Sequence, residues 1–526
     1  MKFIRANFVV YPFLFGLYPV LALIAHNANE MDLSSGIRAL LASLLFTLVI
    51  YTISLLLIRN PAKAALLTSV FILLFYSYGH INLLARDWSL VGVSIGRHRV
   101  LLPIYLALFI LAGWLILRTK RELEGSTRIL NAFALILLFM PLYQLAAGQV
   151  EQYRARGEVE QTAASQSLVS ISPDQLLPDV YYIVLDGYPR GDFINQYFDT
   201  SNLAFLEALE ERGFYVAHCS QSNYSDTRFS LASTLNMTYL DGGENTPLVV
   251  HSGSVLDEMI RSGEIQQNFS ELGYTIITFE SGYKWLRWEL SDHHPSPQPA
   301  ANAQLSNIGL NDFESLLLDT TAARLLLDVP VFLESDRLAE ILDNPRASHR
   351  ERVLYSLDQL GQIPATYPSP KFVYAHIIFP HPPFVVDENG SPLENAPADE
   401  LAAYADHITY LDQRLLDIVD TLQEDAEQKP VIILQGDHGA TIAYREQGID
   451  PALRLGILNA YYLPIGAEKD ESANRPADLL YPGISPVNSF RLVFDTYFNA
   501  DYGLLEDKSI IGRQSPYTEL ICEPPK

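Results

Sequence analysis

Five apolar stretches of membrane-spanning length follow one another within the first 150 residues, and they constrain the fold more than any other feature. They run approximately from Phe8 to Ala25, Ile37 to Ile58, Ala64 to Leu84, Val100 to Leu117 and Ile129 to Ala147. A helix crosses the hydrocarbon core of a bilayer with about 20 apolar residues. We therefore predict a domain of five transmembrane helices over residues 1–150.

The basic residues between these stretches predict the orientation of the domain. One side carries Lys2, Arg5, Arg59, Lys63, Arg118, Lys120, Arg121 and Arg128, and the other carries Arg38, Arg86, Arg97 and Arg99. Because cytoplasmic loops are enriched in Lys and Arg, the N-terminus is expected in the cytoplasm, and five spans place the chain after Ala147 outside it. No Asp, Glu or Lys lies in the middle of a span, so a transport path is not indicated. The spans either anchor the protein or also hold a lipid substrate.

The charge of the chain is divided unevenly. The formal net charge of the 526 residues is −25, yet residues 1–150 carry twelve Lys or Arg and five Asp or Glu, which leaves −32 for the rest. A domain this acidic is not expected to bind nucleic acid. Cys219 and Cys522 are the only cysteines, too few for a disulfide scaffold or a thiolate metal site. They could pair if this part lies outside the cytoplasm.

Strands and helices alternate after a polar linker over residues 151–178. The expected strands are Val180 to Leu185, Phe214 to Val216, Tyr274 to Phe279, Phe372 to Ile378 and Val431 to Leu434. The expected helices are Phe205 to Gly213, Asp312 to Leu327, Ala402 to Leu422 and Ser485 to Phe498. This order predicts an α/β domain over residues 179–500, with a mostly parallel sheet and helices on both faces, and a tail over residues 501–526.

Two of the buried strands are followed by acidic residues. Asp186 and Gly187 follow the first strand, and the sequence GDHG after Leu434 places Asp437 beside His438. Ligands of open α/β sheets bind beyond the carboxyl ends of the strands. Asp and His together suit zinc or manganese, with magnesium or calcium as alternatives, so we predict one divalent ion here.

The loop SNYSDTRFSLASTLN, residues 222–236, leads into a helix at Thr227. Backbone N–H groups at a helix entrance favour an anionic ligand, and a hydroxyl group ionised there by a metal can attack an ester. The alternative is that Ser225, Asp226 or Thr227 only caps the helix. Asn223 either donates to a phosphoryl oxygen or serves the turn.

Two further histidines, His376 and His381, lie in AHIIFPHPPF at the end of a predicted strand. The prolines stiffen the exit loop and would hold His381 in place. His376 is equally well explained as a histidine of the core.

Together, VLDG at Asp186, the hydroxyl-rich loop at Thr227, the His-x4-His pair and GDHG resemble the sulfatase-like branch of the alkaline phosphatase superfamily. With five spans ahead of the catalytic domain, the architecture is similar to that of lipoteichoic acid synthases and of the phosphoethanolamine transferases that modify lipid A. The resemblance implies a multi-pass protein of a bacterial-type inner membrane with an extracytoplasmic catalytic domain.

The resemblance also implies residue roles. Thr227 would be the nucleophile and a metal ligand, Asp186, Asp437 and His438 would be the other ligands, and His376 and His381 would hold the phosphate or protonate the leaving group. The expected reaction is transfer of a phospholipid head group, of phosphoglycerol or phosphoethanolamine type, to a cell-envelope glycan or lipid. The alternatives are a sulfatase or phosphatase of a soluble ester, and an inactive binding protein.

Two features depart from the resemblance. The C-x-P-S-R type motif of sulfatases is absent around Thr227, which argues against sulfate-ester hydrolysis. Asp186 stands where the lipid-modifying transferases usually carry Glu.

Overall fold

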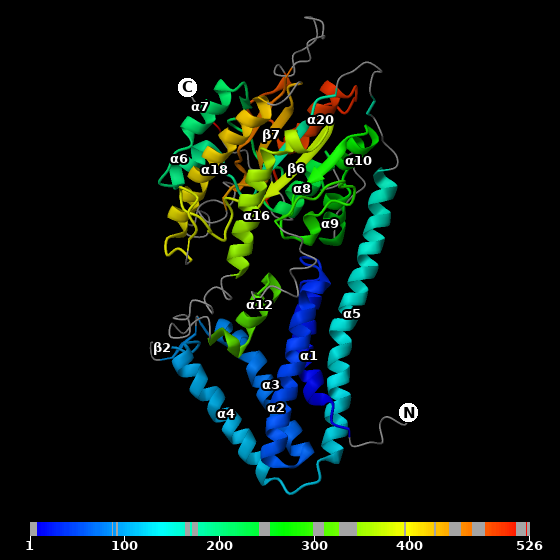
Figure 1. Cartoon of the computed structure of the whole chain (residues 1–526), viewed down its shortest axis with the longest axis vertical. Helices are drawn as coiled ribbons and strands as arrows, with labels where there is room; N and C mark the ends of the chain where they lie inside the picture. The colour runs from blue at the N-terminus through cyan, green and yellow to red at the C-terminus, as the bar shows by residue number, and fades with distance from the viewer. Residues whose placement is uncertain are drawn as a thin grey trace, which may run out of the picture. The chain divides into compact units, whose positions relative to one another are not determined.

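The chain forms two units in a computed structural model (Figure 1). The structure describes residues 8–86, 88–90, 93–163, 169–170, 177–240, 253–297, 310–325, 344–393, 396–424, 428–440, 454–464, 479–511 and 522. One unit, here called the membrane unit, comprises Met1–Glu151 and Pro299–Pro345. The other, the α/β unit, comprises Gln152–Gln298 and Arg346–Lys526.

Five apolar helices make up most of the membrane unit. They are α1 (Tyr11–His26), α2 (Ile37–Ile58), α3 (Pro61–Leu84), α4 (His98–Arg118) and α5 (Glu124–Ala163), the last of which continues into the α/β unit. Four of them, α2 to α5, are long and apolar enough to cross a membrane, which confirms four of the five predicted spans. Helix α1 has only 16 residues. At about 1.5 Å per residue it covers about 24 Å, less than the about 30 Å of a bilayer core.

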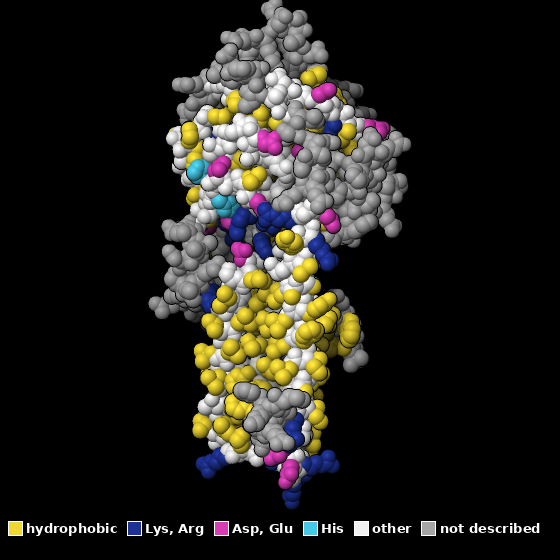
Figure 2. Space-filling model, turned by 90° about the vertical axis from the view of Figure 1, so that its right-hand side faces the viewer, with side chains coloured by type: hydrophobic (Ala, Val, Ile, Leu, Met, Phe, Trp, Pro, Cys, Tyr) yellow, Lys and Arg dark blue, Asp and Glu magenta, His cyan; other side chains and the backbone are white. Residues whose placement is uncertain are grey.

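The outer surface of the membrane unit is hydrophobic over most of its length (Figure 2). Leu56 and Leu57 of α2, for example, are 71% and 78% exposed, as expected for side chains in contact with lipid. Inside the unit, small and polar residues bring the helices together: the Ser43 hydroxyl donates to the Gly16 carbonyl at 2.7 Å and accepts from Tyr76 at 2.7 Å.

A short helix from the middle of the chain belongs to the membrane unit. Helix α12 (Asp312–Thr320) begins at a capping box of Asn311 and Glu314 and is followed by the 3-10 turn η3 (Ala322–Arg324). Phe313 is fully buried among α1, α2 and α3, and Glu314 pairs with Arg38. The predicted helix from Asp312 to Leu327 is therefore corrected in two respects. It ends at Thr320, and it belongs to the membrane unit rather than to the α/β domain.

The α/β unit contains a six-stranded sheet in the order β4-β8-β7-β3-β6-β5. The strands are β3 (Val180–Leu185), β4 (Tyr215–Val216), β5 (Thr275–Thr278), β6 (Lys371–Ile377), β7 (Val431–Gly436) and β8 (Asn459–Tyr462). Strands β5, β6, β3 and β7 are parallel neighbours, whereas β8 runs antiparallel to β7 and to β4. The sheet is thus mixed and mostly parallel, as predicted.

Helices cover both faces of this sheet because alternate side chains of each strand point to opposite sides. Odd-numbered residues of β3 pack with α7 (Leu203–Glu211), α16 (Asn344–Leu360) and α18 (Glu400–Glu424). Even-numbered residues pack with α8 (Thr227–Leu235), α9 (Gly253–Arg261), α10 (Glu264–Glu271) and α20 (Pro486–Tyr497). The register then aligns the strand ends: Leu185 faces Ile377 on one side and Gly436 on the other. The residues that follow these three strands must share one edge.

Candidate metal centre

Three buried side chains meet at that edge. Asp186 follows β3, and Asp437 and His438 follow β7; each offers a ligand atom, and these atoms lie within 4.8 Å of one another. The His438 Nε2 atom lies 3.9 Å from Asp186 Oδ1 and 3.6 Å from Asp437 Oδ2. Asp186 precedes Asp437 and His438 by about 250 residues in the sequence, yet the three predicted ligands lie close together in space.

The backbone around Asp437 fixes one of its oxygens and leaves the other available. Asp437 Oδ1 accepts from the Gly187 and His438 N–H groups, each at 2.8 Å. Asp437 Oδ2 and Asp186 Oδ1 are buried and have no hydrogen-bond partner among the described residues. Buried carboxylate oxygens without a partner are costly, and a bound cation would offset that cost.

The tautomer of His438 also suits the binding of a cation. Its Nδ1 lies 2.9 Å from the Gly439 carbonyl, which can only accept, so the neutral ring carries its proton on Nδ1. The lone pair of Nε2 then faces the two carboxylates, as in a metal-binding histidine oriented by a backbone carbonyl. Two carboxylates and one imidazole fit a divalent ion such as zinc or manganese.

The pKa values of the two acids move in opposite directions. Burial, and then the nearby charge of Asp437, raise the pKa of Asp186 well above its usual value. Burial also acts to raise the pKa of Asp437, but His438, His376 and the Gly187 N–H outweigh it and hold that pKa below the ordinary value. Two adjacent carboxylates cannot both ionise cheaply, and a bound cation would favour the ionised form of both.

Thr227 lies at the first position of α8, beside these residues. Its Oγ1 atom is 3.1 Å from His438 Nε2. Asp226 is the N-cap, and its side chain accepts from the Arg228 N–H at 3.1 Å, so Thr227 itself does not cap the helix. The hydroxyl groups of Ser222 and Ser230 both donate to the Asp437 carbonyl, at 2.6 and 2.7 Å, which ties α8 to the end of β7.

His376 and His381 both lie near Asp186. His376 Nε2 is 3.8 Å from Asp186 Oδ2, and both ring nitrogens of this buried histidine have no hydrogen-bond partner among the described residues. Burial lowers the pKa of His376 to about 4, with Asp437 opposing this effect, so the ring is neutral at pH 7. The His381 N–H donates to the Asp186 carbonyl at 3.2 Å, and its Nδ1 lies 2.7 Å from the Pro382 carbonyl.

Asn223 has bonds that fit the second of the two roles left open by the sequence, that of serving the turn. The side chain is fully buried. Its oxygen accepts from the Val487 N–H at 2.8 Å, and its amide group donates to Ser485 and to the Lys508 carbonyl, each at 2.9 Å. The hydrogen-bonding capacity of Asn223 is thus used within the protein, and we assign it to holding the loop rather than to substrate.

Two residues near the centre were not predicted from the sequence. The Tyr404 hydroxyl, on α18, donates to the Gly187 carbonyl at 2.5 Å. The charge of Arg454 opposes the larger effect of burial, which raises the pKa of Asp186. No motif marks either residue, because Tyr404 lies inside a regular helix and Arg454 follows GDHG by fifteen residues.

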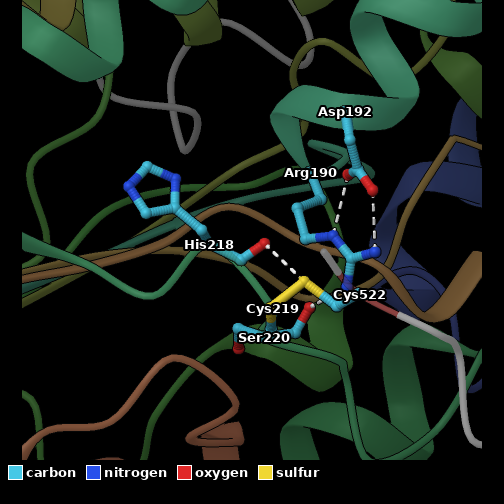
Figure 3. The surroundings of a disulfide bond; sticks show 6 residues. All are labelled: Arg190, Asp192, His218, Cys219, Ser220 and Cys522. Atoms are coloured by element: carbon cyan, nitrogen blue, oxygen red, sulfur yellow. Dashed lines mark hydrogen bonds and ion pairs between the residues drawn. A yellow bond between two sulfur atoms is a disulfide. The ribbon is translucent and has the colours of Figure 1, made fainter. Parts of the chain in front are cut away.

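The segment that leads to Thr227 is held by a disulfide bond between Cys219 and Cys522, whose Cα atoms are 5.4 Å apart (Figure 3). Beside it, the buried Arg190 donates to Asp192 at 2.8 Å and to the Ser220 carbonyl at 3.4 Å. The bond joins the C-terminal region to the chain eight residues before Thr227.

Comparison with known proteins agrees with this arrangement. Residues 291–475 match the model of the sulfatase family. Over these residues the chain is similar to sulfatases. The matched residues include His376, His381, Asp437 and His438, whereas Asp186 and Thr227 precede them. Among curated proteins, none matches this chain.

Solved structures of membrane phosphoethanolamine transferases are similar to this chain. The zinc complex of the C-terminal periplasmic domain of EptC from Escherichia coli is 11% identical, with a TM-score of 0.40, and covers 66% of this chain and 93% of its own. The integral membrane protein EptA from Neisseria meningitidis is 13% identical, with a TM-score of 0.35, over 86% and 88%. The periplasmic domain of EptC from Campylobacter jejuni is 13% identical, with a TM-score of 0.36, over 64% and 94%.

Proposed function

We propose that this protein is a metal-dependent phosphotransferase that uses Thr227 as its nucleophile and moves a phospholipid head group to a glycan or lipid of the cell envelope. One observation carries the proposal: the Thr227 hydroxyl lies 3.1 Å from Nε2 of His438, beside the three buried side chains that could hold a metal ion. A hydroxyl group in that position is well suited to attack phosphorus. It is not needed as a helix cap, because Asp226 already caps α8.

Asp186, Asp437, His438 and Thr227 would hold the metal. When bound, a divalent ion supplies Lewis-acid stabilisation of the charge that develops on a phosphoryl oxygen and lowers the pKa of a coordinated hydroxyl. Zinc or manganese suits the donor set best.

The protein's own residues account for the remaining chemistry. The Thr227 hydroxyl loses its proton as its oxygen forms a bond to phosphorus, while the bond from phosphorus to the oxygen of the donor alcohol breaks and that alcohol gains a proton, so that no net proton is consumed. We assign the donation of that proton to His381, at the exit of β6, whereas the neutral, buried His376 is better suited to accept a hydrogen bond. The acceptor hydroxyl then displaces Thr227 from phosphorus, and the proton of the acceptor hydroxyl passes to the Thr227 oxygen.

The helices of the membrane unit favour a lipid as the donor substrate. Four helices of spanning length and the shorter α1 would together form the five spans, with the N-terminus in the cytoplasm and the α/β unit outside. An enzyme fixed to the bilayer meets a lipid donor without having to extract it from the bilayer. A covalent intermediate on Thr227 also lets two bulky substrates react in turn.

The family match favours one rival, hydrolysis of a soluble sulfate or phosphate ester. Purified full-length protein with zinc or manganese, incubated with phospholipid labelled in the head group, separates the two. We expect label on the Thr227 peptide by mass spectrometry, with a mass increase equal to the transferred group, and its loss when an acceptor extract is added. Label released only to water would favour hydrolysis, and label on another residue would remove Thr227 from the mechanism. The Thr234→Ala variant, which changes the same residue type later in α8, is the matched control.

A further inference from the structure

A buried serine on α8 joins the helix that carries Thr227 to the end of the strand that precedes Asp437 and His438. Ser230 is 1% exposed, and its hydroxyl group donates to the Asp437 carbonyl at 2.7 Å. Thr227 begins the same helix, and residues three positions apart lie on one helical face. One hydrogen bond therefore connects the first turn of α8 to the backbone of a predicted metal ligand.

The peptide group between Asp437 and His438 is held at both ends. The His438 N–H donates to Asp437 Oδ1 at 2.8 Å, and the Asp437 carbonyl accepts from Ser230. Strand β7 ends at Gly436, so the sheet ladder does not continue to that carbonyl. A buried carbonyl group requires a hydrogen-bond partner, and α8 supplies it here. The position of α8 is thus tied to the peptide group that joins two predicted metal ligands.

Ser222 also reaches this carbonyl, but its hydroxyl group is shared. Its Oγ atom lies 2.6 Å from the Asp437 carbonyl oxygen and 2.5 Å from that of Tyr224. One hydroxyl proton cannot serve both oxygens fully. The Ser230 hydroxyl meets only one carbonyl group among the described residues, and its other neighbour is Ser222 Oγ at 3.2 Å. Ser230 is therefore the constant link between α8 and the end of β7.

The helix itself does not favour a serine at position 230. Alanine is the better helix former and brings no polar group into the interior. A serine inside a helix usually bonds to the backbone of its own segment. Ser233, also buried on α8, behaves in this way, because its hydroxyl group donates to the Thr238 carbonyl at 2.6 Å, just after the helix. The Ser230 hydroxyl instead bonds to a different element, so it serves the connection to β7.

We propose that Ser230 is a positioning residue, which holds the Thr227 hydroxyl at the metal centre through the Asp437 carbonyl. The inference rests on the proposed transfer reaction, in which Thr227 attacks phosphorus. The Asp437 carboxylate is fixed separately, by the N–H groups of Gly187 and His438. Loss of the Ser230 hydroxyl would thus displace Thr227 more than the other ligands, and a displacement of about 1 Å can lower a rate about 100-fold.

The first measurement separates positioning from stability. Full-length protein in detergent is loaded with zinc and mixed with increasing amounts of phosphatidylethanolamine and phosphatidylglycerol, each labelled in the head group, and the rate of labelling of the Thr227 peptide is followed. We expect Ser230→Ala to lower the maximal rate at least tenfold, while the donor concentration at half-maximal rate changes less than twofold. Ser233→Ala is the matched control, because it removes a buried hydroxyl group from the same helix, and its maximal rate should stay within twofold of the wild type.

The second measurement requires no turnover. Zinc is titrated by calorimetry into the metal-free, full-length forms of Thr227→Ala, Ser230→Ala and the double variant. If Ser230 acts through Thr227, the two losses of zinc affinity do not multiply. We expect each single variant to weaken zinc binding at least threefold, and the double variant to bind zinc as Thr227→Ala does.

Equal maximal rates in Ser230→Ala and Ser233→Ala would overturn the positioning role, as would losses of zinc affinity that multiply in the double variant. Unchanged zinc affinity in Ser230→Ala would overturn it as well. Failure of the transfer reaction itself would show separately, as the absence of labelled Thr227 in the zinc-loaded wild type. The zinc measurements would then still decide whether Ser230 positions the Thr227 side chain.

Discussion

The hydroxyl group of Tyr404 provides the sharpest test of how the fold positions the metal centre. It is buried, and it donates to the Gly187 carbonyl at 2.5 Å. The N–H of the same glycine donates to Asp437 Oδ1 at 2.8 Å. Gly187 has φ +77°, a conformation that glycine adopts without strain. Tyr404 therefore holds a turn that aligns Asp186 with Asp437.

Replacing Tyr404 with Phe removes one oxygen and leaves the carbonyl buried without that donor. Losing the partner of a buried backbone group costs about 1–3 kcal/mol of unfolding free energy. A group that orients a metal ligand typically changes metal affinity by about 10–100-fold when it is removed. We expect both effects in Tyr404→Phe, with the loss of affinity as the decisive result.

The assay is calorimetric titration of Zn²⁺ into the metal-free, full-length protein, together with chemical denaturation. Tyr410→Phe is the control, because Tyr410 lies on the same helix as Tyr404. Its hydroxyl accepts from Arg414 at 3.2 Å and makes no bond to the turn at Gly187 among the described residues. Unchanged zinc affinity in Tyr404→Phe would refute the positioning role. An equal loss in Tyr410→Phe would show that the effect is general destabilisation of α18.

Three further predictions concern stability. Burial lowers the pKa of His407 to about 3, so between pH 6.5 and 3 the unfolded state binds more protons than the folded state, and the free energy of unfolding decreases as the pH is lowered. The loss at pH 5 is about 2 kcal/mol. Urea denaturation at pH 7 and at pH 5 should show a smaller difference in stability for His407→Gln than for the wild type. The bond between Cys219 and Cys522 closes a separation of 303 residues, which a chain-entropy estimate equates to about 5.7 kcal/mol. Reductant should therefore lower the unfolding midpoint of the wild type and leave that of Cys219→Ser unchanged. A Cβ at Gly79 would lie 2.3 Å from the Asp319 carbonyl oxygen, so Gly79→Val should expose α12 to proteolysis, whereas Gly125→Val, which has open space, should not.

The sequence brought the candidate metal ligands together because the relevant signals are local. Strands β3 and β7 are continuous runs of buried residues, and the polar residue after each run marks its carboxyl end. In a parallel sheet those ends coincide, so Asp186 and Asp437 could be placed together before any coordinates were known. The pairing of Cys219 with Cys522 could not be predicted, because no local pattern in the sequence reports the distance between the two residues.

Other features depend on tertiary partners that no local pattern contains. Asn223 has the residue type expected of a phosphate ligand, and only the positions of Val487, Ser485 and Lys508 show that it binds protein instead. The first apolar stretch has the composition of a span, but its helix begins at Tyr11 and ends at His26, which leaves it short.

The most consequential feature that the sequence did not indicate is the path from β5 to β6. These strands are parallel neighbours, so their connection must cross over the sheet, and such connections usually supply a helix that covers one of its faces. Here part of the connection leaves the α/β unit, and α12 packs against α3 with Phe313 buried and Glu314 paired to Arg38. The chain consequently passes between the two units three times, at residues 151/152, 298/299 and 345/346. A catalytic domain fused to an anchor needs only one such passage. Sequence order alone therefore did not separate the two units, because residues 299–345, between β5 and β6, belong to the membrane unit.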